Sequence, residues 1–302
     1  MRLTEGRYIS LLTDFGFKRI FGSDINKDLL IDFLNSLFNG EQVVKNVTYL
    51  NSEHVGDVYA ERKAIFDVYC ENEHGEKLIV EMQNAYQTYF KDRSLYYATF
   101  PIREQAPKGD NWNFKLQHVY VVALLNYEMS DEAFSHESIN HDVGLLDKQT
   151  HKVFNNKLTF KYVEIARFNK DINELETNFD KWLYVLRNLS RLDNQPTYLR
   201  NEVFNRLFSQ AEIARFDKKE LKAYEDSLKA YRDIKNSLDT AKEEGRAEGR
   251  AEGLAKGRAE GASEKALTIA RELFAMNMSI DNIKKVTGLT DDEIHNLSNT
   301  SL

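Results

Sequence analysis

The sequence predicts an α/β domain, in which helices flank a mixed β-sheet, followed by an all-helical C-terminal extension. Up to about residue 190, apolar strand-like runs alternate with helical patterns in the order helix, β-hairpin, helix, strand. From about residue 174 onward the hydrophobic spacing is helical throughout. A chain of 302 residues is long enough for one large domain with appendages.

The first expected element is helical and covers residues 13–38. Phe17 and Phe21 share one face of it. Further apolar residues recur at helical spacing, namely Leu29, Leu30, Phe33, Leu34, Leu37 and Phe38. Gly22 is expected to divide the stretch into two helices, with Ser23 or Asp24 as the N-cap of the second.

Strands and one further helix complete the predicted domain. The strands are expected at residues 46–50, 64–71, 77–83, 118–127 and 157–165, and the helix at 84–105. The second and third strands form a hairpin around the turn ENEHGE. The run HVYVVALLNY is typical of a strand that is buried on both faces.

The C-terminal part of the chain divides into three segments. A helical extension is expected over 191–241, and residues 242–265 carry a glycine at every fourth position from Gly245 to Gly261. Each glycine costs a helix about 1 kcal/mol relative to alanine. Two interpretations of this repeat are therefore open. It is either a flexible, partly helical connector or a self-associating helix whose small residues allow close approach.

The tail, 266–302, carries the start and stop signals of short helices, with Ser279 and Thr290 as expected N-caps. Its stretch SIDNIKKVTGLTDDEI resembles a small helix-turn-helix. The alternative is a helical hairpin that packs on a partner or dimerises. The second helix begins with acidic residues where a DNA-reading helix needs hydrogen-bond donors, so association is favoured over DNA reading.

Composition narrows the classes of function. The single cysteine, Cys70, excludes an intrachain disulfide, and the scattered histidines have no zinc-site spacing. No apolar run is long enough to span a membrane and no signal peptide is evident, so we expect a cytoplasmic protein without a membrane partner. The net charge of −7 argues mildly against a dedicated nucleic-acid binder. A metal-dependent nuclease remains compatible with it, because such an enzyme gathers acidic groups at its site.

Two carboxylates stand in the apolar strands of the predicted hairpin. Asp67 lies in IFDVYC and Glu81 in LIVEMQ. Because strand side chains alternate between faces, a tight hairpin can set the two side by side, with Gln83 on the same face as Glu81. Burying two such charges requires a shared proton, a basic partner or a divalent cation. The alternative is a solvated sheet face on which they pair with Lys63 or Arg93.

This arrangement resembles the metal-binding core of PD-(D/E)XK nucleases. Asp67 is followed by a hairpin and by Glu81-Met82-Gln83, with TDFGFKRIFG before them and RSLYYATF after them. Within that superfamily the chain resembles the Rpn family of recombination-promoting nucleases, also described as PD-(D/E)XK family transposases. The resemblance covers roughly residues 10–190, and the glycine repeat and tail also resemble members of the family. It implies a restriction-endonuclease-like domain over 1–190.

The resemblance also implies an activity, that of a Mg²⁺-dependent endonuclease that cuts double-stranded DNA and promotes recombination. Asp67 and Glu81 would hold Mg²⁺, with the backbone carbonyl of Met82 as third ligand, an oxygen set that this ion prefers. The ion would lower the pKa of a bound water and stabilise charge on the scissile phosphate. Gln83 would orient the water, but it stands where the general pattern has lysine and carries no charge.

Basic residues elsewhere, or a second metal ion, would then have to supply the missing charge. Lys18, Lys63 and Arg93 are the candidates for contact with substrate phosphates. By analogy with acidic residues on the first helix of such nucleases, Asp14 could be an additional metal ligand. Asp14 and Lys18 could equally be an ordinary i,i+4 ion pair. Arg93, which shares a helix face with Tyr97, could instead support the sheet.

Two classes of function therefore remain from the sequence. The first is the Mg²⁺-dependent nuclease, which the ordered presence of Asp67, Glu81 and Gln83 favours. The second is a non-catalytic DNA-binding or helical assembly module on a decayed nuclease fold, which the acidic composition keeps open. A homo-oligomer formed through the C-terminal helices is expected in addition.

Overall fold

The computed structural model describes residues 6–54, 64–106, 112–129, 134–135 and 137–299. The chain divides into two compact units, Met1–Asn236 and Ser237–Leu302. The helix α6 (Lys218–Ala275) begins in the first unit and ends in the second. Each unit has its own hydrophobic core.

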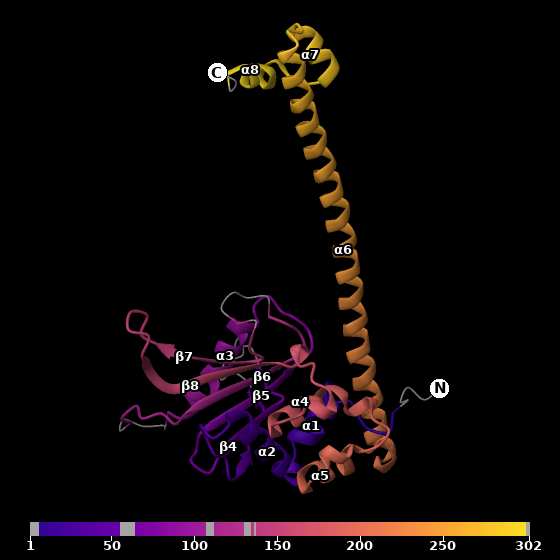
Figure 1. The fold of residues 1–302 in the computed structure, drawn as a ribbon. Helices are drawn as coiled ribbons and strands as arrows, with labels where there is room; N and C mark the ends of the chain where they lie inside the picture. The colour runs from indigo at the N-terminus through magenta and orange to yellow at the C-terminus, as the bar shows by residue number, and fades with distance from the viewer. Residues whose placement is uncertain (1–5, 55–63, 107–111, 130–133, 136, 300–302) are drawn as a thin grey trace. The chain divides into compact units, whose positions relative to one another are not determined.

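A six-stranded mixed sheet forms the centre of the first unit (Figure 1). Its strand order is β1 (Val47–Tyr49), β4 (Val68–Asn72), β5 (Lys77–Gln83), β6 (Val119–Leu125), β8 (Val153–Glu164) and β7 (Asn140–Leu146). The β5–β6 and β6–β8 pairs are parallel, and the others are antiparallel. Every residue of β6 is buried, which confirms the prediction of a strand covered on both faces. Two short strands, β2 (Glu53–His54) and β3 (Ala64–Ile65), pair separately.

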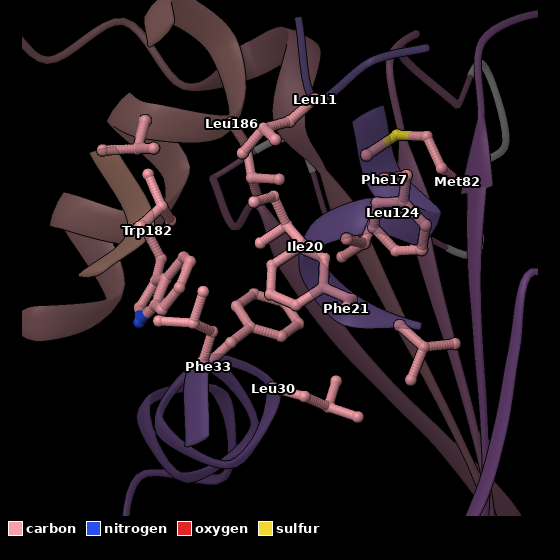
Figure 2. Close-up of a cluster of buried hydrophobic side chains, with 14 of the residues drawn as sticks. Leu11, Phe17, Ile20, Phe21, Leu30, Phe33, Met82, Leu124, Trp182 and Leu186 are labelled. Carbon is pink, nitrogen blue, oxygen red and sulfur yellow. The ribbon is translucent and has the colours of Figure 1, made fainter. Parts of the chain in front are cut away.

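Helices cover both faces of this sheet. One face packs in a single hydrophobic cluster with α1 (Asp14–Phe21), α2 (Lys27–Phe38), α4 (Asn178–Asn188), α5 (Glu202–Ala211) and the first turns of α6. Part of the cluster is drawn in Figure 2. The other face packs against α3 (Phe90–Glu104) through a second cluster. The predicted mixed sheet flanked by helices, with a helical C-terminal extension, is thereby confirmed.

The compact unit continues beyond residue 190, where the sequence analysis ends the nuclease-like domain. Phe204 of α5 and Tyr224 of α6 belong to the same buried cluster as Phe21 of α1. Two hydrogen bonds also join α6 to the N-terminal segment. The Ser10 N–H donates to the Tyr224 hydroxyl at 3.0 Å, and the Phe15 N–H donates to Ser227 Oγ at 3.1 Å.

Truncation is expected to reveal how α6 divides. A chain ending at Asn236 should keep the thermal transition of the first unit, because it retains Tyr224 and Leu228 in the core. A chain ending at Phe216 loses both side chains and should be less stable by about 4 kcal/mol or more. Thermal unfolding followed by near-ultraviolet circular dichroism checks both. Equal transition temperatures for the two truncations would contradict the assignment.

The two-helix start agrees with the sequence except for its cap. Helix α1 ends at Phe21 and Gly22 follows, so the predicted break is confirmed. Ser23 or Asp24 was expected to cap the second helix, and neither does. Ser23 precedes a short 3₁₀ turn, Asp24–Asn26, and makes no side-chain capping bond, while α2 begins only at Lys27, with Asn26 at its N-cap position.

Three predicted elements differ from the structure by more than one or two residues at an end, or are divided. The strand expected at 64–71 is divided into β3 and β4, and the helix expected at 84–105 begins only at Phe90. The strand expected at 157–165 begins earlier, at Val153, and pairs with β7, which the sequence analysis missed. Most of β7 is exposed, so it lacks the apolar alternation that predicts a strand.

The glycine repeat is helical throughout as part of α6, rather than only partly helical. Flexibility of this connector stays a prediction. A Cβ atom built on any of the five glycines from Gly245 to Gly261 would meet no described atom within 4 Å beyond its chain neighbours and the backbone of its own helix. These glycines therefore are not required by packing in the described part of the chain. Self-association through them stays a prediction.

The tail contains two short helices, α7 (Ile280–Thr287) and α8 (Asp291–Asn299). Ser279 and Thr290 precede them, as predicted, and Gly288 ends α7 with a left-handed φ of 72°. The Thr290 N–H donates to the Glu293 carboxylate at 2.7 Å, a capping-box hydrogen bond at the N-terminus of α8. A small core holds the end of α6 against both helices; its buried members are Ala270, Ile283, Leu289 and Ile294. Across the described residues, we find no helix with the length and apolar character needed to traverse a bilayer.

Candidate functional site

Asp67 and Glu81 meet at the open end of the β4–β5 hairpin. The antiparallel register pairs Val68 with Val80, which places the two carboxylates opposite one another one step further along. The Asp67 N–H donates to Glu81 Oε1 at 3.1 Å, and the Met82 N–H donates to Asp67 Oδ2 at 2.8 Å. Side chains thus replace ladder hydrogen bonds here, which explains why the first predicted strand is interrupted at residues 66–67.

The two carboxylates are buried to different degrees. Glu81 is 5% exposed, whereas the Asp67 side chain is 21% exposed. Burial, and then repulsion by Asp67, raises the pKa of Glu81 to about 8. Burial also raises the pKa of Asp67, although the Met82 N–H and then Lys18 oppose the shift. The pair therefore resists double ionisation in the absence of a cation.

The backbone of Met82 lies beside the pair. Its N–H points to Asp67, on the β4 side of β5. Because the N–H and C=O of one strand residue point to the same side of the strand, the Met82 carbonyl is also directed to that side. Two carboxylates and this carbonyl form an oxygen donor set of the kind that Mg²⁺ takes, with water completing its coordination. The chemistry of these donors fits such an ion.

Helix α1 brings Lys18 and Asp14 to the same place. Lys18 Nζ lies 3.8 Å from Asp67 Oδ1 and 2.7 Å from Asp14 Oδ1. Burial lowers the pKa of Lys18, but the Asp14 hydrogen bond and the three nearby carboxylates raise it above its ordinary value, so the ammonium stays charged. Asp14 is thus held in the i,i+4 ion pair that was the alternative to metal binding. Within the described ranges, no three His, Cys, Asp or Glu side chains form a metal-binding group.

Residues that the sequence analysis missed position α1. Asn84 Nδ2 donates to the Leu12 carbonyl at 2.7 Å and so ties the end of β5 to the start of α1. Thr13 caps α1 by accepting from the Gly16 N–H at 3.1 Å. A Cβ at Gly16 would lie 2.1 Å from the Ser10 carbonyl oxygen, so a side chain there would displace the helix. The one sequence signal for Asn84 is its place directly after Gln83.

Gln83 and Arg93 complete the cluster. Gln83 Nε2 donates to Glu81 Oε2 at 3.1 Å, and Arg93 Nη2 of α3 donates to Gln83 Oε1 at 2.5 Å. The structure therefore joins Asp14, Lys18, Asp67, Glu81, Gln83 and Arg93 by consecutive contacts. The remaining candidate, Lys63, lies outside the described residues.

A mixed sheet flanked by helices, with a carboxylate pair on a hairpin and an amide two residues after the second carboxylate, is the arrangement typical of the PD-(D/E)XK class of nucleases. Comparison with protein families agrees. The model described as PD-(D/E)XK nuclease family transposase matches residues 11–241, and the chain belongs to that family. The model described as Rpn/YhgA-like nuclease family, C-terminal HTH domain, matches residues 263–299. Searches of curated proteins and of solved structures found no match.

These matches confirm the resemblance to the Rpn family and support a role as a nuclease in recombination. Nucleases of this class typically use divalent metal ions, which agrees with the oxygen donors at the hairpin. The resemblance of the tail to a helix-turn-helix is confirmed as well, and such a domain suggests DNA binding.

Proposed function

We propose that the chain is a Mg²⁺-dependent endodeoxyribonuclease that cuts double-stranded DNA and thereby promotes recombination. One observation carries the proposal. Asp67 and Glu81 are brought into contact beside the buried apolar residues of β4 and β5, where burial opposes their joint ionisation. Lys18 gives Asp67 a basic partner at 3.8 Å, whereas a divalent cation would compensate the charge of both carboxylates, and an apolar pair would be more stable than two uncompensated ones. A decayed nuclease would be free to lose them.

The proposed roles follow from the geometry. Asp67, Glu81 and the Met82 carbonyl would hold the metal ion, and Asp14 stays with Lys18 unless substrate separates them. When bound, the ion would lower the pKa of a water and stabilise charge on the scissile phosphate. Gln83, whose amide already donates to Glu81, orients the attacking water. Lys18 lies close enough to Asp67 to contact a phosphate held at the pair.

The test is cleavage of supercoiled plasmid with Mg²⁺, with Ca²⁺ and with EDTA. Nicked or linear product is expected with Mg²⁺ alone, because Ca²⁺ binds oxygen ligands without the octahedral geometry of Mg²⁺. Asp67→Ala should give no product under any of the three conditions. Cleavage that persists in EDTA, or that survives in Asp67→Ala, would refute the proposed site. Plasmid that stays intact with the wild-type protein would favour the non-catalytic DNA-binding module.

The tail invites a second test, because its family match suggests DNA binding whereas its acidic second helix favours association. A chain ending at Ala262 removes α7 and α8. If the tail associates, this chain should sediment as a smaller species and cut less efficiently through loss of two-site engagement. We expect that result. An unchanged oligomeric state with a fall in salt-dependent duplex affinity would instead assign DNA reading to the tail.

A further inference from the structure

Arg93 carries a positive charge that no carboxylate compensates directly. Its guanidinium donates to the side-chain carbonyls of Gln83 and Gln87, both of them neutral. Its central carbon also lies 5.1 Å and 5.7 Å from the ring centroids of Phe90 and Tyr97. Among the described ion pairs none joins Arg93 to an Asp or Glu, so no carboxylate contacts it directly. Its charge nevertheless lowers the pKa of Glu81 and of Asp67 against the effect of burial, so the half-buried guanidinium acts on the pair from a distance.

The contact with Arg93 fixes which way the Gln83 amide points. With its carbonyl toward the guanidinium, the amide nitrogen faces the Glu81 carboxylate, and both contacts are favourable. A flipped amide would set N–H against the guanidinium and, with Glu81 ionised, oxygen against its carboxylate, so both contacts would be repulsive. Gln83 is 9% exposed, which leaves water little opportunity to relieve that repulsion.

We propose that Arg93 is the positioning residue that allows Gln83 to replace the lysine of the general motif. Arg93 supplies the positive charge, and Gln83 supplies the N–H donor directed at Glu81. The inference rests on the proposed nuclease function and deepens it by naming the source of the missing charge. Lys18 is a poorer source because Asp14 neutralises it at 2.7 Å.

Arg93 is also badly placed to contact a substrate phosphate itself. Both terminal nitrogens are engaged with glutamine carbonyls, and Nε is buried without a hydrogen-bond partner in the described structure. The two aromatic rings add to this confinement. The guanidinium charge of Arg93 therefore acts on the site through the Gln83 amide rather than by direct contact with the substrate.

The test is a double-mutant cycle between positions 83 and 93, measured as single-turnover cleavage with Mg²⁺. Gln83→Lys should lose about 10²-fold, because its new ammonium lies against the guanidinium. Arg93→Met should lose a similar factor, because the amide is no longer fixed and the charge is gone. The double variant should recover to within about 10-fold of wild type, because the lysine ammonium then supplies both the positive charge and the N–H donor. Independent effects would multiply to about 10⁴-fold, and that result would overturn the inference.

Duplex binding in Ca²⁺ gives a readout that does not depend on cleavage. Arg93→Met should change the affinity by less than about 3-fold and leave its salt dependence unaltered. A shallower salt dependence would identify Arg93 as a phosphate contact and overturn the positioning role. Arg103→Met, on the same helix but with an exposed side chain, is the matched control and should leave both measurements unchanged.

Two further comparisons keep the outcome decisive. If Arg93→Met unfolds, Arg93→Gln takes its place in the cycle, and Gln83→Lys should rescue it in the same way. If wild type cuts DNA, Asp67→Ala does not, and the cycle is additive, the proposed function stands and the inference fails. If wild type cuts no DNA with Mg²⁺ or Mn²⁺, both fail.

Discussion

Glu81→Gln is expected to abolish DNA cleavage while stabilising the metal-free protein. Activity should fall below about 1% of wild type, because an amide is a far weaker ligand for Mg²⁺ than a carboxylate. The stability effect has the opposite sign. Burial and repulsion by Asp67 raise the pKa of Glu81 from its ordinary 4.5 to about 8 in the folded state. Folding therefore favours the protonated carboxyl, which the neutral amide imitates.

The pH dependence follows from that raised pKa. In wild type, the contribution of Glu81 to stability is fully present below about pH 4.5 and is lost as the pH rises through about 8. In EDTA, the two proteins should unfold at similar temperatures near pH 4.5. At about pH 8.5, Glu81→Gln should unfold some 5 °C or more above wild type.

Addition of Mg²⁺ should reverse this order, since it stabilises only the protein that binds it. The matched control is Glu71→Gln, which changes a β4 carboxylate that pairs with Lys77 at 2.5 Å, outside the site. It should cleave like wild type. A Glu81→Gln protein that is less stable than wild type at about pH 8.5 in EDTA would show that the carboxylate is already compensated without metal.

Trp182→Ala is expected to destabilise the first unit by about 4 kcal/mol. Trp182 of α4 is fully buried, and its ring lies 5.5 Å, 5.8 Å and 5.1 Å from those of Phe21, Phe33 and Phe204. These rings belong to α1, α2 and α5, so one truncation leaves a cavity where four helices meet. Trp182, Phe21 and Phe33 are labelled in Figure 2. The transition temperature should fall by roughly 10 °C, measured by calorimetry.

The hydrogen bond of Trp182 can be separated from its packing. Its indole Nε1 donates to Asp32 Oδ2 at 2.7 Å. Trp182→Phe keeps most of the ring contact and loses this bond, so it should cost about 1–2 kcal/mol. If Trp182→Ala and Trp182→Phe were equally unstable, the hydrogen bond rather than ring packing would be the main contribution.

The sequence was sufficient for the carboxylate pair because alternation is a strong constraint in a short hairpin. Once Asp67 and Glu81 lie on the two strands, a tight turn leaves few registers, and the observed one opposes them. The fully apolar β6 was predictable for a similar reason. In both cases the information lies within a few residues of the element that it specifies.

The contacts that surround the pair join residues that are far apart in the sequence. Asn84 acts on Leu12, 72 positions away, and no local pattern records that partnership. Arg93 lies in α3, which begins at Phe90 rather than at residue 84 as predicted, and its contact with Gln83 spans ten positions that include the loop before this helix. The helical state of the glycine repeat was not predictable from helix propensity. Propensity alone argues against a continuous helix there, yet the repeat lies inside α6, with regular helix on both sides.

At Asp67, side-chain carboxylates replace the backbone partners of a regular sheet, and this offers a way to detect metal binding. The amide protons of Asp67 and Met82 are bound by the very carboxylates that would hold the ion. Each carboxylate oxygen keeps a second lone pair, so a cation could bind without breaking either bond, while drawing electron density away from both. The amide resonances of these two residues would then titrate with the metal. Occupancy would be reported directly by the backbone, before any DNA is present.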